Sequence, residues 1–139
     1  MSWDLTVINV VDGSKSIDEL KENSIGKLGT KRSVVRKLKE IFPGIDTSDP
    51  DWFVFREGRY SLEFSLGSDE GQVDSFMIHV HGDDEQVVRA LAALCDRTGW
   101  SVLDAATGDL IDFQMDSGKE GYLKWKKYKH HLQEKGWHE

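Results

Sequence analysis

The sequence predicts an α+β protein: a mostly antiparallel sheet of about six strands, with two helices packed on one face and a C-terminal helix. Three observations point to this class. Residues 74–81 alternate between apolar and mixed positions, residues 85–98 carry apolar side chains at helical spacing, and short glycine-containing connections separate further apolar runs. With 139 residues the chain has the length of one domain. We therefore expect a single α+β domain over residues 1–118 and a basic helix over residues 119–139.

The N-terminal part predicts a strand and a short helix. Residues 2–11 carry apolar side chains on both faces of an extended chain, which is typical of a central strand. Ser16 and Glu19 have the spacing of a capping box, so a short helix is expected to follow to about Asn23.

Residues 30–42 predict a longer helix that Thr30 can cap and that Pro43 and Gly44 stop. Apolar residues at helical spacing form its buried stripe: Val34, Val35, Leu38, Ile41 and Phe42. Its outer face is expected to be solvated and is basic, with Lys31, Arg32, Arg36, Lys37 and Lys39.

The middle of the chain predicts a meander. Residues 46–51 are expected to form an acidic loop. Strands follow over residues 52–56 and 60–66, joined by a short hairpin connection that contains Gly58. A further turn leads into the strand over residues 74–81, so three consecutive strands have short connections.

The strand over residues 74–81 has two different faces, because successive side chains point to opposite sides of a strand. One face is apolar and is formed by Phe76, Ile78 and Val80. The other is mixed and carries Ser75, Met77, His79 and His81. This pattern is typical of an antiparallel sheet that is covered on one side.

A helix over residues 85–98 follows this strand. Asp83 or Asp84 can accept hydrogen bonds from its first free amides, and Gly99 can adopt the left-handed conformation that ends it. Two short strands over residues 100–104 and 109–113 are then expected as a hairpin, in which Gly108 supplies the positive φ of the turn.

The C-terminal part changes in character. Residues 115–118 are a predicted linker, and residues 119–135 predict a basic helix with Tyr122 and Trp125 on one stripe. Two placements stay open for this helix. It either docks on the domain, at an edge or on the free face of the sheet, or forms an arm that faces a partner.

Charge is unevenly distributed along the chain, whose net charge is −7. Residues 44–118 hold four Lys/Arg against sixteen Asp/Glu, whereas residues 1–43 hold eight against six and residues 119–139 hold six against three. Nucleic acid is disfavoured as a partner, because an acidic body repels phosphates. The acidic middle favours a partner with a basic surface, or serves solubility.

Composition excludes several classes of protein. No run of 18 apolar residues indicates a membrane span, and the N-terminus lacks the pattern of a secretory signal. Cys95 is the single cysteine and lies on the apolar side of its helix, so we expect it to pack in the core. A cytoplasmic location is the default expectation, and no cofactor is expected, since no phosphate-binding glycine motif is present.

His79 and His81 form the most specific metal-ligand pattern in the chain. Their spacing puts two imidazoles on one strand face, and Asp83 lies just past the end of that strand. These three residues predict a candidate metal site. A metal-binding protein, or a small metal-dependent enzyme that uses His79 and His81, is therefore the alternative function.

No other pattern indicates catalysis. The sequence contains no G-x-S-x-G elbow, no H-E-x-x-H helix and no cysteine with a suitably spaced histidine. Carboxylates are abundant, but sequence does not show which of them converge. We name no catalytic residue and favour a protein without enzymatic activity, although the question stays open.

Three stretches carry a resemblance to known proteins: YSLEF at residues 60–64, residues 73–81, and residues 91–113 with GWSVLDAATGDLIDF. This region resembles small uncharacterised bacterial proteins, some of which look like immunity proteins of contact-dependent or polymorphic toxin systems. The resemblance covers roughly residues 50–113. It implies a small cytoplasmic domain that masks a toxin by surface complementarity.

The leading hypothesis is accordingly a non-enzymatic protein-binding domain, of the kind that neutralises a cognate bacterial toxin. Its partner would be a protein with a basic surface, such as a toxin domain, because charge complementarity speeds association. The expected contact residues are exposed acids: Glu63, Asp69, Glu70, Asp104 and Asp109. Self-association into a homodimer stays open.

Overall fold

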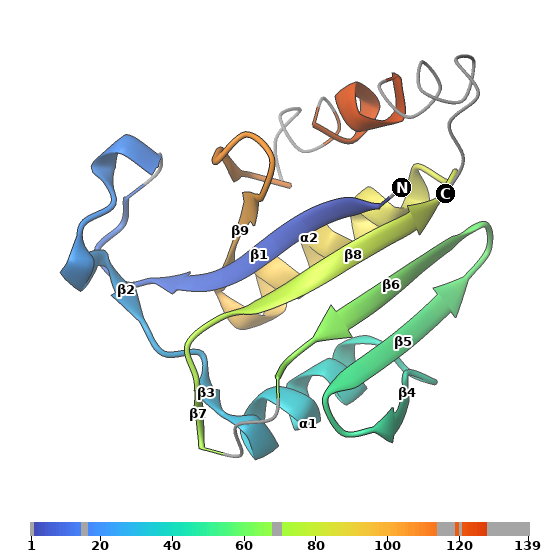
Figure 1. The fold of residues 1–139 in the computed structure, drawn as a ribbon, viewed down its shortest axis with the longest axis horizontal. Helices are drawn as coiled ribbons and strands as arrows, with labels where there is room; N and C mark the ends of the chain where they lie inside the picture. The colour runs from blue at the N-terminus through green and yellow to red at the C-terminus, as the bar shows by residue number, and fades with distance from the viewer. Residues whose placement is uncertain (1, 15–16, 68–70, 114–118, 120, 128–139) are drawn as a thin grey trace.

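The structure is a computed structural model that describes residues 2–14, 17–67, 71–113, 119 and 121–127. Eight strands of this part form one sheet in the order β10-β9-β1-β8-β6-β5-β4, with β2 paired to β1, and β3 and β7 form a separate pair (Figure 1). The strands are β1 (Trp3–Val10), β2 (Ile25–Gly26), β3 (Gly29–Thr30), β4 (Asp46–Asp49), β5 (Trp52–Glu57), β6 (Tyr60–Ser65), β7 (Gln72–Val73), β8 (Phe76–Gly82), β9 (Ser101–Asp104) and β10 (Leu110–Ile111).

The pairings are antiparallel throughout, so the predicted α+β class and the mostly antiparallel sheet are confirmed. The expected number of about six strands is too low for the described part of the chain. β1 lies between β9 and β8, as its two apolar faces indicate, and β5, β6 and β8 are neighbours in the predicted meander.

β4 differs from the prediction, since residues 46–51 were expected to form an acidic loop. Its backbone pairs with β5 at Asp46↔Val54 and Asp49↔Trp52, with an irregular register between them. Backbone groups make these bonds, so an acidic sequence of low β propensity still forms a strand at the edge of the sheet. Charges on such an edge also discourage pairing with other chains.

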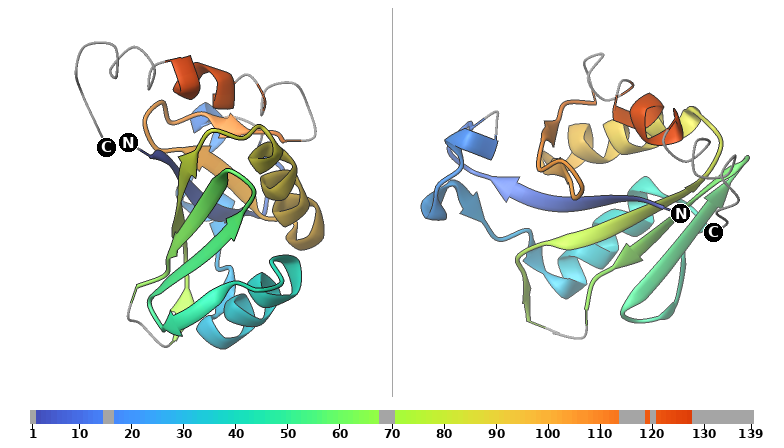
Figure 2. Two further views of the ribbon diagram at one scale, coloured as in Figure 1. Left: turned by 90° about the vertical axis from the view of Figure 1, so that its right-hand side faces the viewer. Right: turned by 45° about the horizontal axis from the view of Figure 1, so that its top comes forward.

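Two helices cover one face of the sheet: α1 (Lys31–Ile41) behind β5 and β6, and α2 (Gln86–Thr98) behind β8 and β1 (Figures 1 and 2). The side chain of Thr30 accepts a hydrogen bond from the Ser33 amide, which confirms the predicted cap of α1. α2 ends at Gly99 with a φ of 77°, also as predicted. In place of the short helix expected to about Asn23, two 3₁₀ turns occupy Ile17–Glu19 and Glu22–Ser24, and Ser16 lies outside the described residues.

The core lies between the sheet and these helices. The strands contribute fully buried side chains at alternating positions, and the helices contribute their predicted apolar stripes. The members from β1, β6 and β8 include Leu5, Val7, Leu62, Phe64, Ile78 and Val80, and those from the helices include Val34, Leu38, Val87, Leu91 and Leu94. None of the helices in the described residues has the length and apolar character needed to cross a bilayer.

Lys31 was predicted to lie on the solvated face of α1, and the structure corrects this prediction. Its side chain is buried, with 4% of the residue exposed. The Nζ atom lies 2.7 Å from Asp51 Oδ1 and 2.9 Å from the Gly67 carbonyl oxygen. Both partners are distant in sequence, so helical periodicity alone assigned this lysine to solvent.

The described part of the C-terminal region packs on the domain. Residues 121–127 are helical, and the buried rings of Tyr122 and Trp125 lie 5.7 and 6.5 Å from the Trp3 ring. Gly121 lies against Trp3 as well, since a Cβ atom there would be 3.4 Å from the Trp3 ring.

This contact lies on the helix side of the sheet, because Trp3 alternates with Asp4 and shares the face of Leu5. The expected placement on the free face is therefore wrong for residues 121–127. The Tyr122 hydroxyl accepts a hydrogen bond of 3.0 Å from the Asp84 amide at the start of α2. The predicted linker at residues 115–118, and the predicted helix beyond residue 127, lie outside the described residues.

Candidate functional site: the open face of the sheet

The second face of the sheet carries no helix in the described part of the chain (Figure 2). The strand register arranges its side chains in rows. One row is polar and runs across β5, β6, β8 and β1: Val54, Glu63, His79 and Asp4. The next row is more apolar and extends to β9: Trp52, Ser65, Met77, Thr6 and Leu103.

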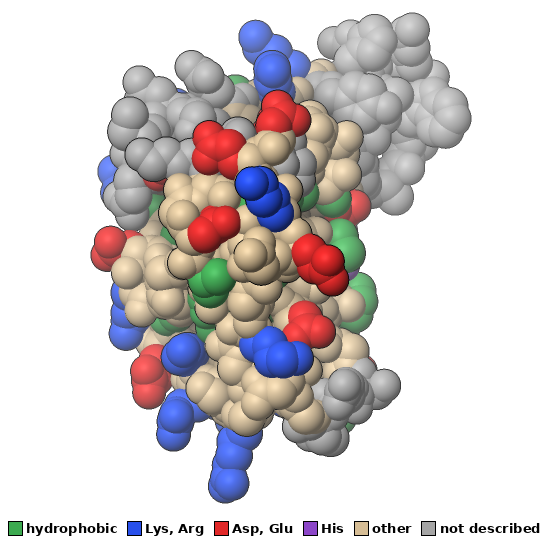
Figure 3. Space-filling model, turned by 90° about the vertical axis from the view of Figure 1, so that its left-hand side faces the viewer, with side chains coloured by type: hydrophobic (Ala, Val, Ile, Leu, Met, Phe, Trp, Pro, Cys, Tyr) green, Lys and Arg blue, Asp and Glu red, His purple; other side chains and the backbone are tan. Residues whose placement is uncertain are grey.

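We define the open-face patch as six side chains from these rows and from the end of β8: Asp4, Trp52, Glu63, Met77, His79 and His81. All six are partly or largely exposed, and Trp52 is 39% exposed, which makes it one of the few large apolar side chains at the surface of the described residues. Figure 3 views the molecule along the sheet and shows hydrophobic side chains beside a histidine at its right-hand edge, where the open face is seen edge-on.

Trp52 and His79 form the centre of the open-face patch. Their rings stack with centroids 5.3 Å apart and an interplanar angle of 12°. His79 Nδ1 lies 2.8 Å from Asp4 Oδ1, and the Ser2 hydroxyl donates a hydrogen bond to the same oxygen. This chain of contacts fixes the His79 ring, which in turn supports one face of the Trp52 ring. Trp52 is not among the contact residues predicted from the sequence. The alternation with buried Phe53 and Phe55 was the available signal.

His81 and Glu63 form a second pair on the open-face patch. His81 Nε2 lies 3.0 Å from Glu63 Oε2, and both side chains are about one-third exposed. Glu63 is thus a predicted contact residue that lies on the uncovered face. It sits between Val54 and His79 in the strand register.

The three candidate metal ligands lie in one region of the fold, but each of them contacts a different side chain. His79 and His81 point to the same face, as predicted, yet each contacts a different carboxylate. Asp83 Oδ1 lies 2.7 Å from Lys126 Nζ. The described residues contain no group of three His, Cys, Asp or Glu side chains arranged to hold a metal ion. Metal binding by His79, His81 and Asp83 stays a prediction.

Asp104 was predicted to be an exposed contact residue, and the structure corrects the predicted exposure. Only 8% of it is exposed. Its Oδ2 accepts a 3.0 Å hydrogen bond from Trp3 Nε1, and its Oδ1 accepts hydrogen bonds from the amides of Ala106 and Thr107. The side chain faces inward because it alternates with Leu103 and shares the face of buried Val102. Asp104 therefore holds the turn and the Trp3 indole from the buried face of β9.

The other predicted acids differ in position. Asp109 is exposed and lies in the turn between β9 and β10, away from the centre of the open-face patch. Asp69 and Glu70 lie outside the described residues.

β4 adds two exposed acids that the sequence analysis had placed in a loop. Asp46 and Asp49 lie opposite Val54 and Trp52 in the register, at the border of the open face. A hydrogen bond from the Ser48 hydroxyl, a second from the Ser48 amide and the charge of Arg56 lower the pKa of Asp46. The Asp46 carboxyl group is therefore charged at neutral pH.

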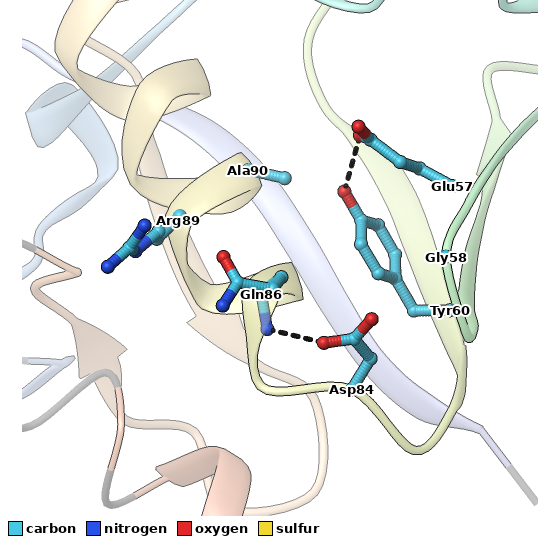
Figure 4. Close-up of a pocket in the computed structure, with 7 residues that line it drawn as sticks. All are labelled: Glu57, Gly58, Tyr60, Asp84, Gln86, Arg89 and Ala90. Carbon is cyan, nitrogen blue, oxygen red and sulfur yellow. Dashed lines mark hydrogen bonds between the residues drawn. The ribbon is translucent and has the colours of Figure 1, made fainter.

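A pocket of about 540 Å³ lies on the other side of the sheet, between the β5–β6 hairpin and the first turn of α2 (Figure 4). The Tyr60 hydroxyl donates a 3.2 Å hydrogen bond to Glu57 Oε2. Burial, together with the charge of Glu57, raises the pKa of Tyr60 to about 12, so this hydroxyl stays protonated at neutral pH.

Asp84 joins the two walls of this pocket. Its carboxylate accepts hydrogen bonds from the amides of Gln86 and Arg59, and these bonds lower its pKa. The Gln86 bond confirms the predicted role of Asp83 or Asp84 at the start of α2. In Figure 4 the Arg89 side chain points away from Glu57 and Tyr60. Asp84 thus holds the hairpin against the helix, while Glu57 bonds to Tyr60 within the hairpin.

Cys95 is likewise unsuited to nucleophilic chemistry. Its side chain packs against the core, and burial raises the pKa of its thiol to about 12. A nucleophilic cysteine instead needs a lowered pKa, since the thiolate is the reactive form.

Comparison of the chain with protein-family models, with curated proteins and with solved structures finds no match.

Proposed function

We propose that this chain is a non-enzymatic protein-binding domain whose contact surface is the open face of its sheet. The single observation that carries the proposal is the stacked and supported Trp52–His79 pair at the centre of that face. Exposed tryptophans held in one orientation are typical anchors of protein interfaces, because little side-chain freedom is lost on binding.

The surroundings of this pair support a protein partner. The patch mixes apolar Met77 with the carboxylates of Asp4 and Glu63, which resembles the composition of an interface core and rim. The acidic middle of the chain favours a partner with a basic surface.

We propose further that the partner is a toxin domain and that binding neutralises it by covering its active surface. Residues 50–113 resemble small bacterial proteins, some of which look like immunity proteins of toxin systems, and this resemblance supports the assignment together with the acidity of the region. Such a role requires shape and charge complementarity and no catalytic group in this chain.

Affinity capture tests the function. The full chain is immobilised, exposed to lysate of its source cells at low and moderate salt, and its bound proteins are identified by mass spectrometry. We expect one basic protein near stoichiometric amount, released as salt increases, because screening weakens interactions between exposed charges. That protein is then purified, and its toxicity and its binding to the chain are measured directly.

Two results would contradict the proposal. Absence of any salt-sensitive, near-stoichiometric protein from the capture contradicts the binding function. A captured protein that is not toxic to cells, and whose own activity is unchanged when the chain is added in excess, contradicts the neutralising role but leaves protein binding intact.

A further inference from the structure

We infer that the open-face patch receives an arginine-bearing segment of a basic partner protein, with the guanidinium stacked on Trp52 and within reach of the carboxylates of Asp49 and Glu63. The inference rests on the proposed protein-binding function. It goes further by naming the side chain that is recognised and the residues that recognise it.

The Trp52 ring provides a prepared platform. One of its faces is supported by the His79 ring, which Asp4 holds at 2.8 Å, while 39% of the residue remains exposed. Cations are attracted to the face of an indole, and a guanidinium also stacks flat on it. A platform that is already oriented loses little entropy when an arginine binds.

Charge favours a cation at this place. Four carboxylates lie on the open face or at its β4 border: Asp4, Asp46, Asp49 and Glu63. The same strands contribute one guanidinium, that of Arg56, and two imidazoles, of which His79 contacts Asp4 and His81 contacts Glu63. Asp49 lies directly opposite Trp52 in the register. In the described residues, neither Glu63 nor Asp49 is paired with a lysine or an arginine.

Charge also selects among the candidate occupants of this face. A second copy of the chain would bring the same carboxylates against each other, and nucleic acid would bring phosphates against them, so both are disfavoured. A basic protein segment has the opposite charge. Arginine fits better than lysine, because its planar fork can stack on Trp52 and donate two hydrogen bonds to one carboxylate.

The test uses a short glycine-spaced arginine peptide as the probe, with the same peptide carrying citrulline as its matched neutral control. Citrulline keeps the shape of arginine and removes its charge. The ¹⁵N-labelled full chain is titrated with each peptide at low salt. We expect saturable shifts of the Trp52 indole N–H and of the Glu63 and His79 amides with the arginine peptide, loss of these shifts at high salt, and none with citrulline.

Variants locate the contact. We expect Trp52→Leu to weaken binding of the arginine peptide about tenfold, and Glu63→Gln to weaken it a few-fold. Asp96→Asn removes an exposed acid on α2, on the other side of the sheet, and is expected to leave the affinity unchanged. Thermal unfolding of each variant confirms that it is folded. Glu63→Gln serves as the deciding variant if Trp52→Leu is unstable.

Four results would overturn the inference. Shifts centred on α2, equal binding of the arginine and citrulline peptides, and an affinity unaffected by both Trp52→Leu and Glu63→Gln each contradict it. Sedimentation of the free chain as a dimer that Trp52→Leu dissociates would also contradict it, because a second copy would then occupy the face.

The capture experiment separates this inference from the proposed function. If wild-type chain and Trp52→Leu/Glu63→Gln chain capture the same partner equally well, protein binding stands and the recognition of arginine by the open-face patch fails. If neither captures a partner, the proposed function itself fails.

Discussion

The two faces of the sheet are made by the same strands, yet they are built for different tasks. On the helix side, alternate residues such as Leu62 and Ile78 are completely buried between sheet and helices. On the open side, their neighbours Glu63 and His79 are partly exposed and make polar or stacking contacts with other side chains of that face. The difference teaches that one face specifies the fold, while the other presents side chains to solvent, as the proposed recognition of a partner requires.

The largest expected effect on stability comes from truncating a buried side chain on the helix-covered face. Leu62→Ala should lower the free energy of unfolding by about 3 kcal/mol, because a fully buried leucine is lost and a cavity remains. Leu103→Ala, on the partly exposed open side of β9, is the matched control and should cost about 1 kcal/mol or less. Urea denaturation measures both. Equal losses at the two positions would break the comparison between the faces.

Asp104 tests whether an acid on the covered side is structural. Asp104→Ala removes the acceptor for the Trp3 indole and for two turn amides, so a loss of about 2 kcal/mol is expected. Asp104→Asn keeps an oxygen for the turn and should lose less. Asp109→Asn, in the same turn but exposed, is the control and should be nearly neutral in the same denaturation experiment.

Tyr122 extends the comparison to the C-terminal region on the helix side. Tyr122→Phe keeps the ring against Trp3 but removes the hydroxyl that accepts from the Asp84 amide, so we expect a loss of about 1 kcal/mol. Chemical denaturation followed by Trp fluorescence reads this change. An unchanged stability would mean that water replaces the hydroxyl at no cost.

Alkaline pH should lower the free energy of unfolding gradually and by a smaller amount, through groups on the covered side. Burial raises the pKa of Cys95 from 9.0 to about 12, and burial with the charge of Glu57 raises that of Tyr60 from 10.0 to about 12. Both groups lose their protons at lower pH in the unfolded chain than in the fold, so rising pH favours unfolding. The free energy of unfolding should be level from neutral pH to about pH 9 and fall between pH 9 and 12. Cys95→Ala should delay this fall to about pH 10, and a rise in stability over this range would contradict the assignment.

Local patterns predicted much of the fold for clear physical reasons. α1 and α2 have apolar stripes, caps and stop signals within their own sequences, and β8 has a regular alternation. β4 could not be found in this way, because its acidic residues have no strand pattern and its pairing partner is β5. Lys31 was misplaced for the same reason, since Asp51 and Gly67 come from other parts of the chain.

The candidate site was predictable only in part. The sequence correctly put His79 and His81 on one mixed strand face and singled out Glu63, but the contacts His79–Asp4 and His81–Glu63 depend on which strands are neighbours. Trp52 was missed because sheet order was unknown, so its stacking on His79, two strands away, had no local signal. Asp104 was expected to be exposed, because β9 carries apolar residues on both faces and only the packed structure shows that the face of Val102 and Asp104 is the buried one.

The central claim, that the open face is the recognition surface, is tested most directly by hydroxyl-radical footprinting of the chain with its captured partner. Trp52 and Met77 are readily oxidised reporters on the open face, and exposed Val11 and Ile25 report on a region at the far end of β1. We predict that binding protects Trp52 and Met77 and leaves Val11 and Ile25 unchanged. Unaltered oxidation of Trp52 and Met77 in a saturated complex would contradict the claim.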